Sequence, residues 1–473
     1  GDTSAYIDNN VSLINELHNN WRENKNININ SSSDRRLDNY AFAGGGGAGA
    51  LTGSDANTVI DTTTRAYTGD QIGINYSRDT YYNYDVGDWV TIRAADRSAV
   101  STEANGLNIG GISIGASRAN TELKPVIEAY TGSQNIFDIE GDLRVKAEHL
   151  LPAGSGDYSA YSRTEAAMGS LVGANATISE VYNSTMTSSS LGDNNILTVG
   201  GNLAVQSLNY TSLYGSSIGL AGGVAVAGLN KVNIDSETET EAEIGSGTRG
   251  SADGYLSLKA VGNDTIGSDI LSGTGGGVTG NVATATINND PLTSVLFKGG
   301  NLNQGQSLYG GNIYITSDYT NTLKSLVNSM NASVAGGSGA HLDNNINPVV
   351  DIDLGTDNFI PYLRGKNLNI KAENNIHKVK PGNGEYNTKA SSGGVVTGAA
   401  ASSVTEIGDN DEDSSKAKMT EIKIFDGSLI DISGKASLDA LNNFDLYDKS
   451  KLDAGGGIST ARSQSQITVN RAY

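Results

Sequence analysis

The carboxylates best suited to bind an ion lie in one short acidic run. Residues 409–413 read Asp-Asn-Asp-Glu-Asp, so that Asp409, Asp411 and Asp413 alternate along the chain. Closely spaced carboxylates supply the hard oxygen ligands that calcium prefers. The run lacks the glycine at the sixth place and the glutamate at the twelfth place of an EF-hand loop. A solvated acidic loop is therefore the preferred interpretation, calcium bound by the three aspartates is the alternative, and no other cofactor is expected.

A cluster of aromatic residues with one arginine is the best candidate for contact with a ligand. Its members are Tyr76, Arg78, Tyr81, Tyr82, Tyr84 and Trp89. Tyrosine and tryptophan rings stack on sugars and anchor protein partners. We interpret the cluster as a contact site for a glycan or protein on a host or bacterial surface. The alternative is a row of outward tyrosines that stabilises one face of a sheet.

The sequence shows no motif of known catalytic chemistry in the structural setting that such a motif needs. The four histidines lie far apart, and none has the spacing of a metal-binding motif. The string G-x-S-x-G occurs at 111–115 and 215–219, but neither is interpreted as a nucleophile elbow, which needs a strand-to-helix turn. Ser338 falls in a glycine block that other parts of the chain share. The sequence therefore predicts no catalytic residue and no enzyme. A polysaccharide-cleaving enzyme remains an alternative, because such enzymes need only two facing carboxylates and acidic residues are abundant.

Composition excludes several classes of partner. The net charge of −20 would repel nucleic acid, so no nucleic-acid partner is expected. The longest weakly polar run, 218–229, is too short to cross a bilayer, and no membrane insertion is expected. Cysteine is absent. The order of a secreted chain of this size would then come from backbone pairing and not from disulfides.

The segments that must position these side chains repeat along the whole chain. Eight segments place two apolar residues around a spacer and end in alanine or serine. The closing residues are Ser31, Ala94, Ala147, Ser207, Ala260, Ser317, Ala372 and Ala440. They are separated by 63, 53, 60, 53, 57, 55 and 68 positions. A loose period near 58 is typical of a stacked repeat protein.

A block of tiny residues follows each of these segments, for example Gly44–Gly47, Gly222–Gly223 and Gly455–Gly457. The segments alternate apolar and polar residues, as half-buried strands do. Residues 237–244 alternate in the same way, with four glutamates on one face. The expected fold is all-β, a right-handed parallel β-helix with short helical or loop excursions. We expect two or three coils of ordinary width in each repeat, and not one very wide coil.

Two stretches show helical spacing of apolar residues, 12–25 and 322–330. We expect a short helical excursion at each. Residues 1–25 are expected to form a cap or helical excursion, and residues 26–473 a continuous solenoid of eight degenerate repeats. Asn202, Asn312 and Asn367 lie at or just before their repeats, where asparagines can form ladders between coils.

The repeats resemble the interior of large filamentous surface proteins of Gram-negative bacteria. The similarity rests on 196–207 (ILTVGGNLAVQS), 220–228 (LAGGVAVAG) and 392–400 (SGGVVTGAA). These stretches are similar to filamentous-haemagglutinin-like, leukotoxin-type adhesins exported by two-partner secretion. The resemblance implies a right-handed β-helical shaft, an outer-membrane secretion partner, an extracellular location on the bacterial surface and a role in attachment and virulence.

The expected function is therefore that of an adhesin shaft, an interior fragment of a surface filament that attaches to host cells, matrix or other bacteria. Two alternatives stay open: a β-helical polysaccharide-cleaving enzyme or phage tailspike, and a structural matrix filament without a receptor.

Replacing Tyr81, Tyr82 and Tyr84 by alanine tests the aromatic cluster as the contact site. Binding to cells or glycans should be lost, because the stacking surfaces are removed. Unchanged binding in a cell-attachment assay would place the contact elsewhere or leave only a shaft.

Overall fold

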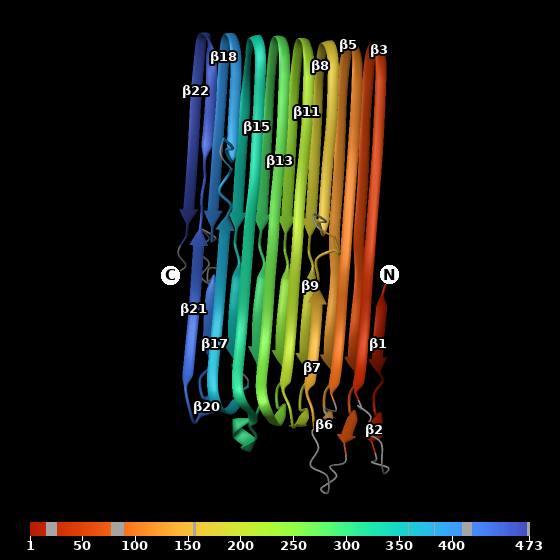
Figure 1. Ribbon diagram of the computed structural model, residues 1–473, viewed down its shortest axis with the longest axis vertical. Coiled ribbons are helices and arrows are strands. Elements are labelled where there is room, and N and C mark those ends of the chain that lie inside the picture. The colour runs from red at the N-terminus through yellow and green to blue at the C-terminus, as the bar shows by residue number, and fades with distance from the viewer. Residues whose placement is uncertain are drawn as a thin grey trace.

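The computed structural model describes residues 1–15, 26–76, 89–154, 158–357, 359–382, 384–408 and 419–470. In this part of the chain nearly every residue is in a β-strand, and all pairings between the named strands are parallel. The strands stack along one axis as a parallel β-solenoid (Figure 1). The predicted fold class is thus confirmed.

Each coil is tall and flat. At one end of each coil the chain bends back, and we call this end the tip. Eight long strands lead through it: β3 (Ile27–Thr68), β5 (Val90–Thr131), β8 (Ala160–Asn183), β11 (Leu203–Ser236), β13 (Arg249–Asn289), β15 (Leu308–Ile346), β18 (Thr388–Ile407) and β22 (Ser450–Val469). Three strands lie in the wall that ascends to the tip: β7 (Leu143–His149), β17 (Tyr362–Lys378) and β21 (Ala436–Asp445). The tips form the upper edge in Figure 1.

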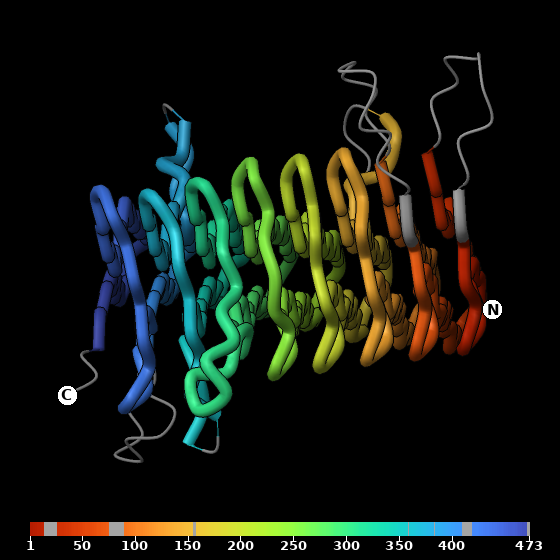
Figure 2. The backbone as a smooth tube through the Cα atoms, turned by 90° about the horizontal axis from the view of Figure 1, so that it is seen from below, coloured from red at the N-terminus to blue at the C-terminus, as the bar shows by residue number. Residues whose placement is uncertain are grey.

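Shorter strands complete the coils below. Six continue the descending wall: β1 (Thr3–Ile7), β9 (Met186–Leu191), β12 (Glu239–Ile244), β14 (Leu292–Phe297), β16 (Val349–Leu354) and β19 (Thr420–Ile424). Five lie at the base: β2 (Ser12–Asn15), β4 (Gly73–Tyr76), β6 (Ile136–Ile139), β10 (Ile196–Val199) and β20 (Leu429–Ile432). The helix among the described residues is η1 (Leu302–Gln304), a single 3₁₀ turn. Viewed from below, the coils follow one another in chain order (Figure 2).

One sequence repeat is one coil. Ala94 pairs with Ser31 on one side and Ala147 on the other, and the same register continues to Ala440. The expectation of two or three narrower coils per repeat was therefore wrong. The prediction failed because the glycine block forms the bend at the tip, where two long walls meet, and not a corner of a shorter coil.

One predicted helix is wrong, and a second is contradicted at its start. Residues 322–330 lie within β15, where Leu323 and Val327 point inward and Lys324 is exposed. Ser12–Asn15, where the other helix was expected to begin, is strand β2 paired with β4. Residues 16–25 lie outside the described residues, so the rest of that expectation stays a prediction. The axial pairing of each strand with both neighbouring coils outweighs a helical spacing of apolar residues. Strand β1 pairs with Thr64–Thr68 of β3, so Thr3–Ile7 already belong to the solenoid and not to a separate cap.

The interior changes from base to tip. Large apolar residues such as Phe137 and Phe297 fill the wide base. A second cluster that includes Ile60 and Leu123 fills the middle. Near the tip the two walls meet through small polar residues, as where Asn281 Nδ2 donates to Ser272 Oγ at 3.0 Å. The abundance of Ala, Gly and Ser in the sequence reflects this taper.

Asparagines join successive coils, as the sequence predicted. Asn367 Nδ2 donates to Asn312 Oδ1 at 2.8 Å, and the Tyr255 backbone N–H donates to Asn202 Oδ1 at 3.0 Å. At the base turn the Asn135 backbone N–H donates to the buried Asn195 Oδ1 at 2.8 Å.

Gly276→Ala should destabilise the solenoid strongly, by at least about 2 kcal/mol. Gly276 has φ +150°, and a Cβ there would lie 1.6 Å from the Gly223 carbonyl oxygen of the adjacent coil. Gly280→Ala, four residues further on in β13, is the control, because nothing lies within 4 Å of its Cβ position. Urea unfolding followed by circular dichroism measures both. Equal stability of the two variants would contradict the close axial approach of the coils at the tip.

Candidate functional site

A polar groove crosses the descending wall where the long strands end. Tyr182, Asp235, Asn288, Asn345 and Glu406 are register partners on five successive coils. Their chain neighbours, such as Ile234 and Ile287, point into the core. Because side chains alternate along a strand, the five residues must face outward in one axial row.

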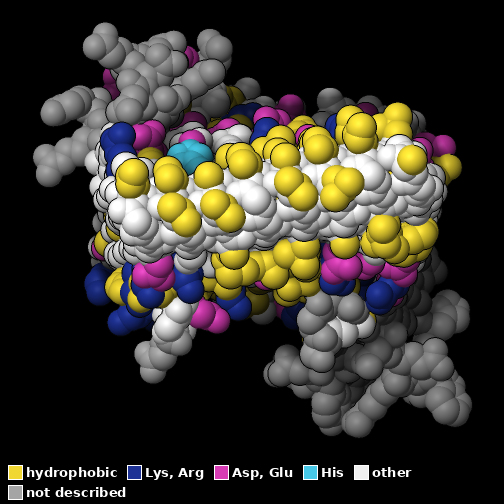
Figure 3. All heavy atoms as spheres, turned by 90° about the horizontal axis from the view of Figure 1, so that it is seen from above, with side chains coloured by type: hydrophobic (Ala, Val, Ile, Leu, Met, Phe, Trp, Pro, Cys, Tyr) yellow, Lys and Arg dark blue, Asp and Glu magenta, His cyan; other side chains and the backbone are white. Residues whose placement is uncertain are grey.

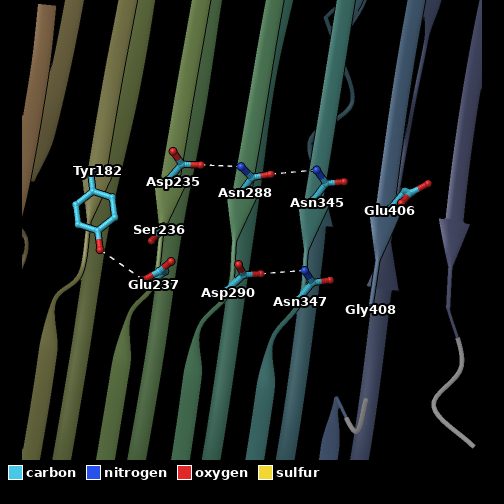
Figure 4. Close-up of a pocket in the computed structure, with 10 residues that line it drawn as sticks. All are labelled: Tyr182, Asp235, Ser236, Glu237, Asn288, Asp290, Asn345, Asn347, Glu406 and Gly408. Atoms are coloured by element: carbon cyan, nitrogen blue, oxygen red, sulfur yellow. Dashed lines mark hydrogen bonds between the residues drawn. The ribbon is translucent and has the colours of Figure 1, made fainter. Parts of the chain in front are cut away.

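A second row lies two residues further along each coil. It contains Glu237, Asp290, Asn347 and Gly408, and the chain bends here before the next short strand begins. The backbone stays in register through the bend, since the Asp290 N–H donates to the Ser236 carbonyl at 2.8 Å. The bend between the two rows makes a hollow of about 480 Å³ (Figure 4).

Axial hydrogen bonds fix the side chains in the groove (Figure 4). Asn288 Nδ2 donates to Asp235 Oδ1 at 2.6 Å, and Asn345 Nδ2 donates to Asn288 Oδ1 at 3.0 Å. In the second row Asn347 Nδ2 donates to Asp290 Oδ1 at 2.9 Å. Tyr182 Oη donates to Glu237 Oε2 at 3.4 Å. The three amides thus share one orientation, with the nitrogen of each directed at the preceding coil.

The groove is acidic and rich in amides. Four of the ten described lining residues are Asp or Glu, three are Asn, and none is basic. At one end the Lys124 ammonium lies 5.1 Å from the centre of the Tyr182 ring. Beside a tyrosine, carboxylate and amide oxygens can accept hydrogen bonds from hydroxyl groups, and amide nitrogens can donate to them. Binding of a sugar requires such contacts. Among the described residues no group of three or more His, Cys, Asp or Glu side chains could hold a metal ion.

The predicted contact cluster lies only partly within the described residues. Tyr76 ends strand β4 at the base of the coil. Trp89 directly precedes β5, is 42% exposed, and its ring lies 4.9 Å from the Arg144 guanidinium carbon. Arg78, Tyr81, Tyr82 and Tyr84 lie outside the described residues, so their role as a contact site stays a prediction.

The predicted calcium loop also stays a prediction. Asp409, Asp411 and Asp413 lie outside the described residues. The residue that precedes them, Gly408, lines the groove.

The sequence analysis missed the groove residues, although a signal was present. Asp235, Asn288 and Asn345 are spaced by 53 and 57 positions, the spacing of neighbouring repeats. Aligning repeats by these spacings would have grouped the three side chains. With two or three coils expected in each repeat, positions 53 and 57 residues apart were not expected to be direct neighbours.

A buried polar cluster elsewhere is structural. Tyr319 Oη donates to Asp264 Oδ2 at 2.8 Å and accepts from Asn289 Nδ2 at 2.6 Å. Burial raises the pKa of the Asp264 carboxyl, against the opposing effect of hydrogen bonds from Thr211 and Tyr319. Asp264 and Tyr319 are at most 1% exposed, so no substrate reaches them.

The glutamate-rich stretch adjoins the groove. Strand β12 (Glu239–Ile244) turns Thr240, Ala242 and Ile244 inward and its glutamates outward, as predicted. Lys298 Nζ lies 2.7 Å from Glu243 Oε1. Burial raises the pKa of Glu241, and the charges of Glu243 and Glu239 raise it further.

No protein-family model, curated protein or solved structure matches this chain. Within the described residues, no helix has the length and apolar character that a membrane crossing requires. The groove and the solenoid are therefore interpreted from their own geometry.

Glu241→Gln should raise the free energy of unfolding at pH 7. The folded-state pKa of Glu241 is raised, so its ionised form disfavours folding at neutral pH and protonation relieves this as the pH falls toward 4.5. The gain should be below about 1 kcal/mol, because the carboxyl keeps contact with water. It should shrink toward pH 4.5 in urea titrations.

Glu122→Gln is the control of opposite sign. The hydrogen bond from Lys124 lowers the pKa of Glu122, so the ionised form favours folding above its unfolded pKa. This variant should be slightly less stable than the wild type at pH 7. A Glu241→Gln variant that is also less stable at pH 7 would contradict the assignment.

Proposed function

We propose that the protein is part of the shaft of a secreted bacterial surface filament that attaches its cell to another surface. The observation that supports this proposal is the axial parallel pairing of eight successive coils, from the β1–β3 pair to the β18–β22 pair, with one register shift between Ala252 and Tyr255. Such a body holds a contact surface at a fixed distance from its point of anchoring, and its stiffness comes from main-chain hydrogen bonds.

The groove supports an adhesive role in addition to a structural one. It repeats similar polar side chains over five coils, and the axial hydrogen bonds hold them in place before a partner arrives. Preorganised groups lose little conformational entropy on binding. A strip of this kind suits an extended polar ligand, and we propose an uncharged or cationic glycan chain on another cell.

The acidic surface fits the same role. With a net charge of −20, neighbouring filaments repel each other and stay dispersed. The absence of basic lining residues in the described groove disfavours a strongly anionic polysaccharide as the ligand.

A second candidate function is cleavage of a polysaccharide. Asp235, Glu237 and Asp290 bring several carboxylates to one hollow, beside Tyr182. Hydrolysis of a glycosidic bond needs two carboxyl groups that face each other. Release of reducing ends from a polysaccharide panel by the wild type, but not by Glu237→Gln, would favour the enzyme over the adhesin.

The triple variant Tyr182→Ala, Asn288→Ala and Asn345→Ala tests the groove. Attachment of protein-coated beads to cultured epithelial cells, and binding to a glycan array, should fall at least tenfold, because the ring and the amides that contact the ligand are gone. The matched control is Tyr314→Ala, Asn328→Ala and Asn375→Ala on the ascending wall.

The control triple should bind like the wild type. Equal loss in both triples would point to a stability effect, which circular dichroism would reveal. Wild-type binding that survives the groove triple would remove the groove as the contact site, and a wild type that binds no cell or glycan would leave the shaft alone.

A further inference from the structure

The tip of the solenoid is an edge almost without charged side chains. Eight successive coils each contribute eleven residues to it, we call this surface the tip ridge, and seven of its segments are uncharged. These seven segments are 43–53, 106–116, 166–176, 219–229, 272–282, 329–339 and 390–400. They contain no Asp, Glu, Lys, Arg or His, in a chain with 52 acidic and 32 basic residues. The eighth coil adds only Asp453 and Arg462 at the two margins.

Apolar side chains project from the ridge on each of the last seven coils. They are Ile112, Leu171, Val224, Val278, Val334, Val395 and Ile458, and each is 60–67% exposed. Viewed from above, apolar side chains stand at intervals along the whole edge (Figure 3). Soluble monomers rarely expose an apolar strip that is continuous over such a length.

The projecting residues are separated by gaps. The position occupied by Val224 in one coil is Gly277 in the next, and Val334 follows in the coil after that. Glycine occupies this position on every third coil, at Gly111, Gly277 and Gly457, and coils lie about 4.8 Å apart, so the gaps recur at regular intervals along the ridge. A surface of this kind can interdigitate with an identical one, as the dry interfaces between stacked sheets do.

We propose that the tip ridge is a self-association surface, at which two copies of this chain meet ridge to ridge around a two-fold axis. Electrostatics favours a second copy at this place. Two chains of charge −20 repel each other when their walls approach. At the ridge no charged group of the seven segments opposes contact.

The size of the ridge is sufficient for a specific dimer. Eight coils at about 4.8 Å give a length of roughly 35–40 Å. With a width of roughly 15–20 Å, each copy would bury about 600–700 Å², which reaches the lower range of specific interfaces. A lipid surface is a weaker occupant, because apolar strips that bind membranes are usually flanked by several basic residues and the ridge carries only Arg462, at its margin.

The triple variant Val224→Glu, Val278→Glu and Val334→Glu tests the proposal by sedimentation equilibrium. The wild type should form dimers in a concentration-dependent way, and the variant should stay monomeric at concentrations at least tenfold higher. The three side chains are 60–64% exposed, so the fold should survive, which circular dichroism verifies.

The control triple is Ile136→Glu, Leu151→Glu and Val379→Glu. It adds the same charge at exposed apolar positions outside the ridge and should dimerise like the wild type. A wild type that is monomeric throughout would overturn the proposal, as would a ridge triple that still associates. Association through the open end strands β3 and β22 would belong to this second case, and solution scattering would show lengthening along the coil axis.

Flotation with phosphatidylcholine vesicles distinguishes binding of the ridge to a membrane from self-association. A monomeric wild type that floats with the vesicles, together with a ridge triple that does not, would assign the ridge to a membrane and overturn self-association.

Discussion

Axial main-chain hydrogen bonding is the constraint on which the rest of the structure depends. Each strand of an inner coil pairs in parallel with the coil before it and the coil after it, so that a residue's neighbours are fixed by its position in the repeat. Such a body has no single compact core. It has a thin interior that continues from coil to coil, and order in one coil depends on its two neighbours.

The same constraint explains why chemistry appears in rows. Tyr6, Tyr67 and Tyr130 stack with ring centres 5.0 and 4.9 Å apart, because their coils hold them one above another. Amides and carboxylates form the groove for the same reason. At the tip, glycine and small apolar residues recur because two walls must meet closely. The same register therefore produces the groove on the descending wall and the ridge at the tip.

Much of the fold could be predicted from the sequence. Alternation identified the strands, and the closing residues Ser31 to Ala440 gave the true coil register. The width of the coil could not be derived, because a glycine block is compatible with a corner or a full reversal. Residues 322–330 show how local spacing misleads: Leu323 and Val327 suit a helical face equally well, and only the neighbouring coils decide for strand. Contact sites were harder to predict, since a groove forms from residues more than fifty positions apart.

The most direct test uses the absence of cysteine from the chain. Asn233 and Thr286 are register partners on the outer face of adjacent coils, whereas Lys259, half a repeat from Asn233, lies on the opposite wall. Asn233→Cys with Thr286→Cys should form a disulfide in high yield under mild oxidation, since Cα atoms about 5 Å apart permit one. Asn233→Cys with Lys259→Cys should form none. Efficient bonding in the second pair and not in the first, measured by mass spectrometry, would contradict one wide coil per repeat and the axial register with it.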